Sequence, residues 1–170
     1  DDDCMMPDDW GNILRKAHAD NPAFNNIDSW RFPEEDFVPE LAEQKIHSFP
    51  GGHRVMRNCW VEGSGYVMKR QCVDRLGLLR EGQSWVQYCV ETAAAGWING
   101  WYYPFLYQEH MDDPRSPHTL LKTDEDLKRY MPLSAEKNGA PTLKDWQAQL
   151  RRSARLMQEA SIDPRHYTGW

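Results

Sequence analysis

The sequence predicts an α/β fold, and two observations carry this prediction. Segments whose apolar residues recur at helical spacing alternate with apolar segments of strand length, which is typical of helices that cover a sheet. The chain has 170 residues, of which 40% are hydrophobic and eight are Trp, and this is enough for one packed domain. The predicted strands are too few for a complete sheet. Because the chain opens at Asp1 without a Met, we expect the missing strands to lie upstream in a longer protein.

The first predicted helix covers residues 7–20. Pro7 and the acids that follow it suit a first helical turn, and Pro22 ends the helix. The apolar residues that share one face of this helix are Trp10, Ile13, Leu14 and Ala17. Residues 21–54 predict an irregular excursion with a short helix at 39–47, because they contain four prolines and the pair Gly51–Gly52. Excursions of this kind often carry a binding surface.

The remaining elements alternate between strands and helices. Residues 55–70 predict a strand interrupted at 62–65, and residues 97–107 predict a buried strand. Helices are predicted at 70–77 and 84–96, each ended by a glycine. Thr123 and Thr142 each open a further helix with a Thr-x-x-Asp capping box. The last helix is amphipathic, with apolar positions at Leu143, Trp146, Leu150, Ala154 and Met157.

Composition excludes several classes of partner. The net charge of −6 argues against general binding to a phosphate backbone, so no nucleic-acid partner is expected. No apolar run approaches the roughly 20 residues that span a bilayer, so no transmembrane segment is expected in this chain. The four cysteines form no Cys-x-x-Cys pair, which favours buried free thiols in a reducing compartment. We therefore expect a cytoplasmic location, with peripheral membrane association as the alternative.

Three adjacent carboxylates, Asp1 to Asp3, begin the chain. Adjacent carboxylates repel one another unless a positive charge lies nearby. The triplet is therefore either a solvated surface run or a site for a hard divalent cation such as Mg²⁺ or Mn²⁺. The helix that follows places the triplet at the end of the preceding strand, where ligands bind in open α/β sheets.

A second polar cluster follows the strand predicted at 97–107. Residues 108–119 combine two His, three acids, one Arg and two Pro. His110 has three readings: a capped surface residue, a core residue or a metal ligand. Arg115 and His118 are donors suited to phosphate or hydroxyl groups. The alternative is a surface turn held by salt bridges. Similarly, Trp101 and its aromatic neighbours in the strand are either sugar-stacking surfaces or simply core.

Three quoted segments resemble nucleotide-sugar glycosyltransferases of the GT-A fold, similar to family 2. "DDDC" looks like the Asp-x-Asp motif of that family. "VEGSGYVMKRQCVDRLGLL" looks like its strand, glycine-rich turn and helix, and "AAAGWINGWYYPFLYQEH" like its helix, strand and terminal His. The resemblance covers residues 1–119 and rests on order and spacing. It implies the C-terminal half of a GT-A-like, Rossmann-related fold (1–119), which contains the metal and the acceptor side, followed by a helical extension (120–170).

The resemblance also implies a set of site residues. Asp1, Asp3 and His110 would hold Mn²⁺ or Mg²⁺ against the diphosphate of the donor. The donor sugar would be lined by Glu62, Gly63 and Ser64. Arg115 and His118 would close over the phosphates in a mobile loop.

One position departs from the family pattern. Inverting members usually carry an acidic pair at the start of the helix before the last strand, where its carboxylate takes the proton of the acceptor hydroxyl. Here that place holds Ser84 and Trp85, and the nearest acids are Glu81 and Glu91. Either Glu81 acts as the catalytic base, or the enzyme is retaining, or the chemistry has been lost.

The expected function is therefore metal-dependent glycosyl transfer. A sugar would move from a nucleotide-diphosphate donor to a saccharide or other hydroxyl acceptor, in glycan or polysaccharide synthesis. Two rivals remain open: a metal-dependent phosphoester hydrolase that uses the same acids to activate water, and a non-catalytic carbohydrate-binding or scaffold domain.

Overall fold

A computed structural model describes residues 3–62, 64–137 and 139–167, so Asp1 and Gly63 lie outside the described residues. The described chain is mixed α/β. Its main sheet has five strands in the order β3-β4-β6-β2-β5. In the middle, β6 (Ile98–Tyr103) pairs antiparallel with β4 (Arg54–Asn58) and parallel with β2 (Phe24–Asp28). The edge strands are β3 (Ile46–Ser48) and β5 (Tyr66–Val67).

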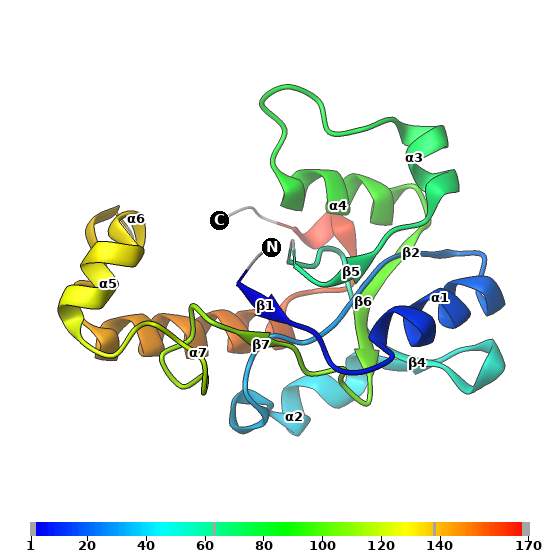
Figure 1. Cartoon of the computed structure of the whole chain (residues 1–170). Coiled ribbons are helices and arrows are strands. Elements are labelled where there is room, and N and C mark those ends of the chain that lie inside the picture. The colour runs from blue at the N-terminus through cyan, green and yellow to red at the C-terminus, as the bar shows by residue number, and fades with distance from the viewer. Residues whose placement is uncertain (1–2, 63, 138, 168–170) are drawn as a thin grey trace.

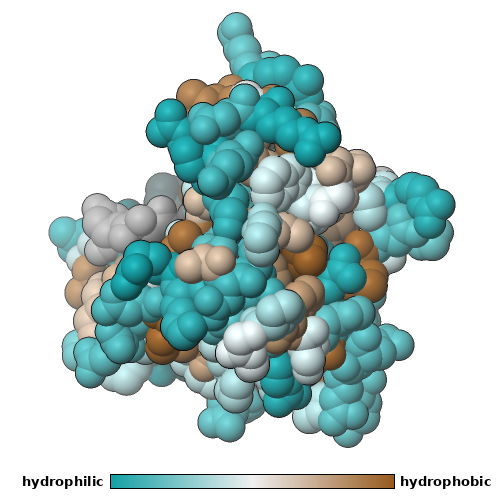
Figure 2. All heavy atoms as spheres, turned by 90° about the vertical axis from the view of Figure 1, so that its right-hand side faces the viewer, coloured by the Kyte–Doolittle hydropathy of each residue, from teal (hydrophilic) through white to brown (hydrophobic). Residues whose placement is uncertain are grey.

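Helices lie on both faces of this sheet (Figure 1). On one face, α1 (Trp10–Asp20) packs Leu14 and Ala17 against Phe24 and Ile27 of β2. On the other face lie α4 (Trp85–Ala94) and α7 (Leu143–Glu159). The shorter helices are α2 (Pro39–Ala42), α3 (Arg70–Leu76), α5 (Asp124–Tyr130) and α6 (Pro132–Lys137). Figure 2 shows that the side of the molecule that carries α1 is mostly hydrophilic, with hydrophobic residues in scattered patches.

The larger hydrophobic cluster joins the sheet to α7. Trp30 and Trp101 are fully buried and meet edge to face, with ring centroids 5.3 Å apart. Each large apolar side chain buried in this way contributes about 1.5–3 kcal/mol relative to exposure. The same cluster contains Leu150, Ala154 and Met157 of α7. Residues 1–119 and residues 120–170 therefore share one hydrophobic core.

Local sequence signals gave the helices correctly. The structure contains the helices expected near 7–20, 70–77, 84–96 and 142–160, with boundaries shifted by up to three residues. Thr123 forms its capping box with Asp126, and the Thr142 side chain accepts a hydrogen bond from the backbone of Asp145. The four cysteines are free thiols, and all except Cys4 are buried. Among the described helices, none has the length and apolar character needed to cross a membrane.

The prediction that residues 21–54 are irregular was wrong, although the short helix expected at 39–47 is present in part as α2 (Pro39–Ala42). This segment contains β2, all five residues of which are buried, together with β3 and the start of β4. The strand was hidden because Asn25, Asn26 and Asp28 make it look like a loop. Asn25 donates to the Oδ1 of Asn99 in β6 at 3.2 Å, and the backbone of Asn26 donates to the same oxygen. These bonds satisfy the Asn25 amide and the Asn26 backbone N–H, while the side-chain oxygens of Asn25, Asn26 and Asp28 stay buried without a hydrogen-bond partner among the described residues.

The strand predicted at 55–70 was also wrong in its extent. Strand β4 ends at Asn58, and β5 is a separate edge strand that pairs with β2. The chain alone supplies more strands than the sequence predicted. A further two-stranded ladder joins β1 (Cys4–Met5) to β7 (Glu109–His110), with Cys4 opposite His110.

Candidate metal and substrate site

The β1–β7 ladder brings the two ends of the predicted metal site together. The backbone N–H of Met111 donates to the carbonyl oxygen of Asp3 at 2.8 Å. The Nδ1 atom of His110 lies 3.7 Å from an Oδ atom of Asp3. Potential ligand atoms of Asp3, Cys4 and His110 all lie within 4.8 Å of one another. The structure therefore places Asp3 beside His110, as the sequence predicted, whereas Asp1 lies outside the described residues.

The chemistry of this cluster fits a divalent cation. Burial lowers the pKa of His110, and the charge of Arg31 lowers it further, which favours the neutral imidazole that binds metals. The backbone N–H of Asp112 donates to Nδ1 of His110 at 3.4 Å, and burial raises the pKa of the Asp112 carboxyl. Burial and the charge of Asp3 raise the pKa of the Cys4 thiol to about 12. A carboxylate, an imidazole and a thiol are donor types that hold metal ions in proteins, and the choice of Mn²⁺ or Mg²⁺ stays a prediction.

A cavity of about 600 Å³ opens beside His110. Its lining includes Glu62 and Ser64, two of the residues expected at the donor sugar. Two indole side chains, Trp60 and Trp85, also line it, and α7 contributes Ser153 and Met157. A cavity of this size accommodates a small organic ligand, and its mixture of aromatic and carboxylate groups is the kind that recognises hydroxylated rings.

Arg31 is a site residue that the sequence analysis missed. Its Nε lies 2.9 Å from a carboxylate oxygen of Glu62, with which Arg31 forms an ion pair, and its charge lowers the pKa of His110. Burial raises the pKa of Glu62, and the charge of Arg31 offsets this only in part. Behind this pair, Asp28 is fully buried, and burial followed by the charge of Glu62 raises the pKa of its carboxyl. The sequence signal that could have indicated Arg31 is its place between two aromatic residues, Trp30 and Phe32. Both aromatic side chains are buried in the structure.

The glycine-rich turn is shaped by its packing. Gly65 has φ +66°, and a Cβ there would lie 2.3 Å from Oε1 of Gln108 and from Oγ of Ser29. Ser29 donates to the carbonyl of Gly65 at 3.0 Å, and Gln108 donates to Ser64 Oγ at 2.9 Å. The turn therefore needs glycine in order to approach Ser29 and Gln108, and this contact fixes Ser64 at the cavity wall.

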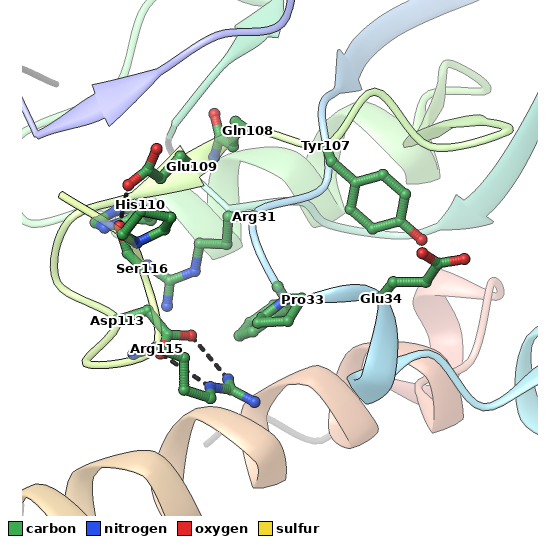
Figure 3. Close-up of a pocket in the computed structure, with 12 residues that line it drawn as sticks. Arg31, Pro33, Glu34, Tyr107, Gln108, Glu109, His110, Asp113, Arg115 and Ser116 are labelled. Carbon is green, nitrogen blue, oxygen red and sulfur yellow. Dashed lines mark hydrogen bonds and ion pairs between the residues drawn. The ribbon is translucent and has the colours of Figure 1, made fainter. Parts of the chain in front are cut away.

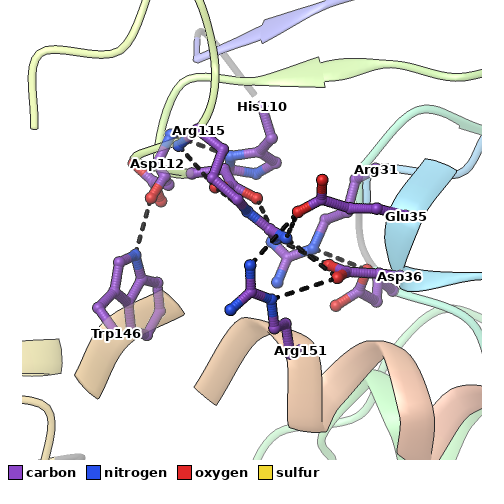
Figure 4. Close-up of polar contacts among 10 residues, drawn as sticks. Arg31, Glu35, Asp36, His110, Asp112, Arg115, Trp146 and Arg151 are labelled. Atoms are coloured by element: carbon purple, nitrogen blue, oxygen red, sulfur yellow. Dashed lines mark hydrogen bonds and ion pairs between the residues drawn. The ribbon is translucent and has the colours of Figure 1, made fainter. Parts of the chain in front are cut away.

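Arg115 lies in a dense ion cluster (Figure 4), and it also lines a second cavity beside His110. Its guanidinium donates to Asp113 at 2.7 Å, to Asp36 at 2.7 Å and to Glu35 at 3.0 Å. Arg151 of α7 joins the same carboxylates, with 3.6 Å from its Nε to Asp36. The phosphate-binding role of Arg115 stays a prediction, but these contacts favour a structural one, as in the salt-bridged turn considered above.

His118 is likewise held within its loop. Its Nδ1 lies 2.9 Å from a carboxylate oxygen of Glu109, and its backbone N–H donates to Glu109 at 2.9 Å. Hydrogen bonds from Ser116 and His118 lower the pKa of Glu109 to about 2. The ring of His118 is exposed, so it stays a candidate donor, although one already paired with a carboxylate.

Glu81 does not join these residues. It is exposed and lines a different cavity with Arg80, Gln83 and Tyr167. Its neighbour Arg80 pairs with Glu91 at 2.5 Å, in line with a structural role for Glu91. Ser84, at the family's acidic position, caps α4 by accepting from the backbone of Gln87 at 3.2 Å. The acid that lines the cavity beside His110 is Glu62.

Comparison with known proteins finds no matching family model, no similar curated protein and no similar solved structure.

Proposed function

We propose that this chain carries the metal-binding and acceptor side of a metal-dependent glycosyltransferase that uses a nucleotide-diphosphate sugar. The observation that supports it best is the pairing of Asp3 with His110 at a cavity lined by Arg31, Glu62 and Ser64. Transfer of a sugar from a diphosphate needs positive charge at the leaving group and polar groups at the sugar. These residues offer both within one cavity.

Each side chain has a role in this proposal. Asp3 and His110, with Asp1, would hold Mn²⁺ or Mg²⁺, which as a Lewis acid neutralises charge on the departing diphosphate. Arg31 binds oxygens of the same diphosphate, where its fixed charge and planar donors suit phosphate. Glu62 and Ser64 accept and donate hydrogen bonds at the hydroxyl groups of the donor sugar. Trp85, whose indole donates to the Val61 carbonyl at 2.8 Å, presents a fixed aromatic wall.

Calorimetry tests the metal part of the proposal. Mn²⁺ should bind the wild-type chain in the presence of a nucleoside diphosphate, and Asp3→Asn and His110→Ala should each lose that site. Asp74→Asn is the control, because Asp74 pairs with Arg70 on the exposed surface of α3. Equal Mn²⁺ affinity in all four proteins would exclude the metal site.

Activity tests the reaction. Nucleoside diphosphate should be released from a nucleotide sugar when Mn²⁺ and a hydroxyl acceptor are both present, and a chelator should stop it. Release that is as fast without any acceptor would instead support a hydrolase. Saccharide binding that is indifferent to chelator, with no release, would support a non-catalytic carbohydrate-binding domain.

A further inference from the structure

A second cavity, of about 390 Å³, is also lined by His110 and Arg31 (Figure 3). Both residues line this cavity and the larger one. A ligand in the second cavity would therefore lie against the groups that the proposed function assigns to the metal and the diphosphate. Two cavities that share a wall at the reacting centre are what a two-substrate transferase requires.

The walls of the second cavity are largely apolar. Phe32, Pro33 and Pro117 line it, and the ring of Tyr107 forms one side. Tyr107 is 37% exposed although it is aromatic. Its ring packs edge to face on Phe105, with centroids 5.8 Å apart, so its orientation is fixed. A fixed and partly exposed aromatic ring is a platform on which a flat ligand face can stack.

Most charged groups around this cavity are already paired within the protein. Among the described residues, Arg31 pairs with Glu62, Arg115 with Asp113, and Glu109 with Ser116 and His118. Apart from Arg31, which the proposed function assigns to the donor diphosphate, the lining holds one arginine and three carboxylates, so it offers no surplus positive charge to a second phosphate. An anionic ligand is disfavoured here.

The hydroxyl of Tyr107 and the carboxylate of Glu34 are polar groups of this cavity that can bind a ligand. The Tyr107 hydroxyl and the Glu34 carboxylate point toward each other at one end of the cavity (Figure 3). Burial raises the pKa of Tyr107 and the charge of Glu34 raises it further, so the phenol keeps its proton. A phenol beside a carboxylate presents one donor and several acceptor positions, a pattern that matches neighbouring hydroxyl groups on one ring.

We propose that this second cavity is the acceptor subsite and that it binds a neutral saccharide ring. The ring stacks on Tyr107, and its hydroxyl groups bind Glu34 and the Tyr107 hydroxyl. This inference rests on the proposed function for the identity of the reaction, but binding of the saccharide needs neither the metal nor the nucleotide sugar. Glu34 and Tyr107 come from separate segments, 31–34 and 107–110, which meet at the bridge between Trp30 and Tyr107.

Saturation-transfer NMR with the whole chain tests the subsite directly. The probes are methyl glycosides of glucose, galactose, mannose and N-acetylglucosamine, with cyclohexylamine as a cationic ring and pyrophosphate as an anion. At least one glycoside should receive saturation from the protein without added metal. Tyr107→Ala should weaken its binding by about tenfold, the loss expected for one aromatic platform. Glu34→Gln should weaken it by a smaller factor, because an amide keeps one acceptor.

Tyr130→Ala is the matched control, since Tyr130 is an exposed tyrosine of α5 outside this cavity. It should bind the glycoside as the wild type does. The proposal is overturned if no glycoside binds, if Tyr107→Ala binds as tightly as wild type, or if only the amine or pyrophosphate competes for the site. Loss of Mn²⁺ binding in Asp3→Asn tests the proposed function alone, so the two ideas fail by different measurements.

Discussion

The segment from Glu109 to His118 carries charged residues along its whole length, but His110 near its start and Arg115 further on have different surroundings. At its beginning, His110 meets Asp3 across the β1–β7 ladder and lines the larger cavity together with Arg31 and Glu62. Further on, Arg115 is surrounded by Asp113, Asp36 and Glu35, and its donors are consumed. The side chain of His110 thus borders a cavity, whereas the donors of Arg115 are already bonded to carboxylates of the protein. The difference lies in the partners that the fold supplies, not in the loop itself.

The largest effect should come from removing the centre of the ion cluster. Arg115→Ala leaves Asp36, whose side chain is 4% exposed, and Asp113 without their main partner. Loss of one member of a buried ion pair costs about 3–5 kcal/mol. Urea titration should show this as a lowered unfolding midpoint.

Arg151→Ala provides the comparison for that measurement. Its side chain is 55% exposed and reaches Glu35 at 3.4 Å and Asp36 at 3.6 Å. Its loss should cost about 0–1 kcal/mol. If Arg115→Ala is as stable as Arg151→Ala and binds a nucleotide sugar more weakly, then Arg115 is a ligand-binding residue and the contrast between His110 and Arg115 fails.

A smaller effect is expected at a buried titratable group that lacks an ionic partner. His18 of α1 is buried, and burial, followed by the charge of Lys69, lowers the pKa of its imidazole to about 4 from 6.5. Between these two pKa values the imidazole of His18 is protonated in the unfolded chain and neutral in the folded chain. The stability present above pH 6.5 should fall by about 2 kcal/mol from pH 7 to pH 5.

Denaturant titrations at those two pH values measure this loss. His18→Phe, which keeps an aromatic ring beside Phe24, should remove most of the difference. If the pH dependence is unchanged in that variant, the loss of stability at pH 5 arises from another group. His18 could then not be compared with the ion cluster of Arg115.

The smallest effect is expected at Glu81. This carboxylate is exposed and lies in a cavity apart from His110. Glu81→Gln should leave the free energy of unfolding unchanged and the transfer rate within about twofold of wild type, since surface substitutions remote from the site change little. A loss of turnover of about 100-fold, the size expected for a missing general base, would restore the base assignment made from the sequence.

What the sequence predicted correctly was local. The helix starts at Thr123 and Thr142 and the apolar face from Leu143 to Met157 are set by residues within a few positions of one another. Strand β2 was missed because its Asn residues bond to Asn99, more than seventy positions away in the chain. The expectation that His110 and Asp3 belong to one site came from the family resemblance, because the residue types alone left three readings of His110 open. The Arg115–Asp36 pair and the position of Arg31 depend on contacts between residues that are far apart in the sequence. Residues 21–54, which contain Arg31 and Asp36, have no periodic pattern that would predict such contacts.

The last helix, α7, determines part of the shape of the larger cavity. It is anchored by Trp146, whose indole donates to the Asp112 carbonyl at 2.7 Å, and by Gln158, whose amide bonds to Val38 and Asp36. Between these anchors, Ser153 and Met157 face the larger cavity. Substitution at these two positions would reshape the cavity while Asp3, His110 and Arg31 keep their own contacts. Selectivity could therefore diverge or be engineered from the C-terminal region, independently of the groups proposed to carry out the chemistry.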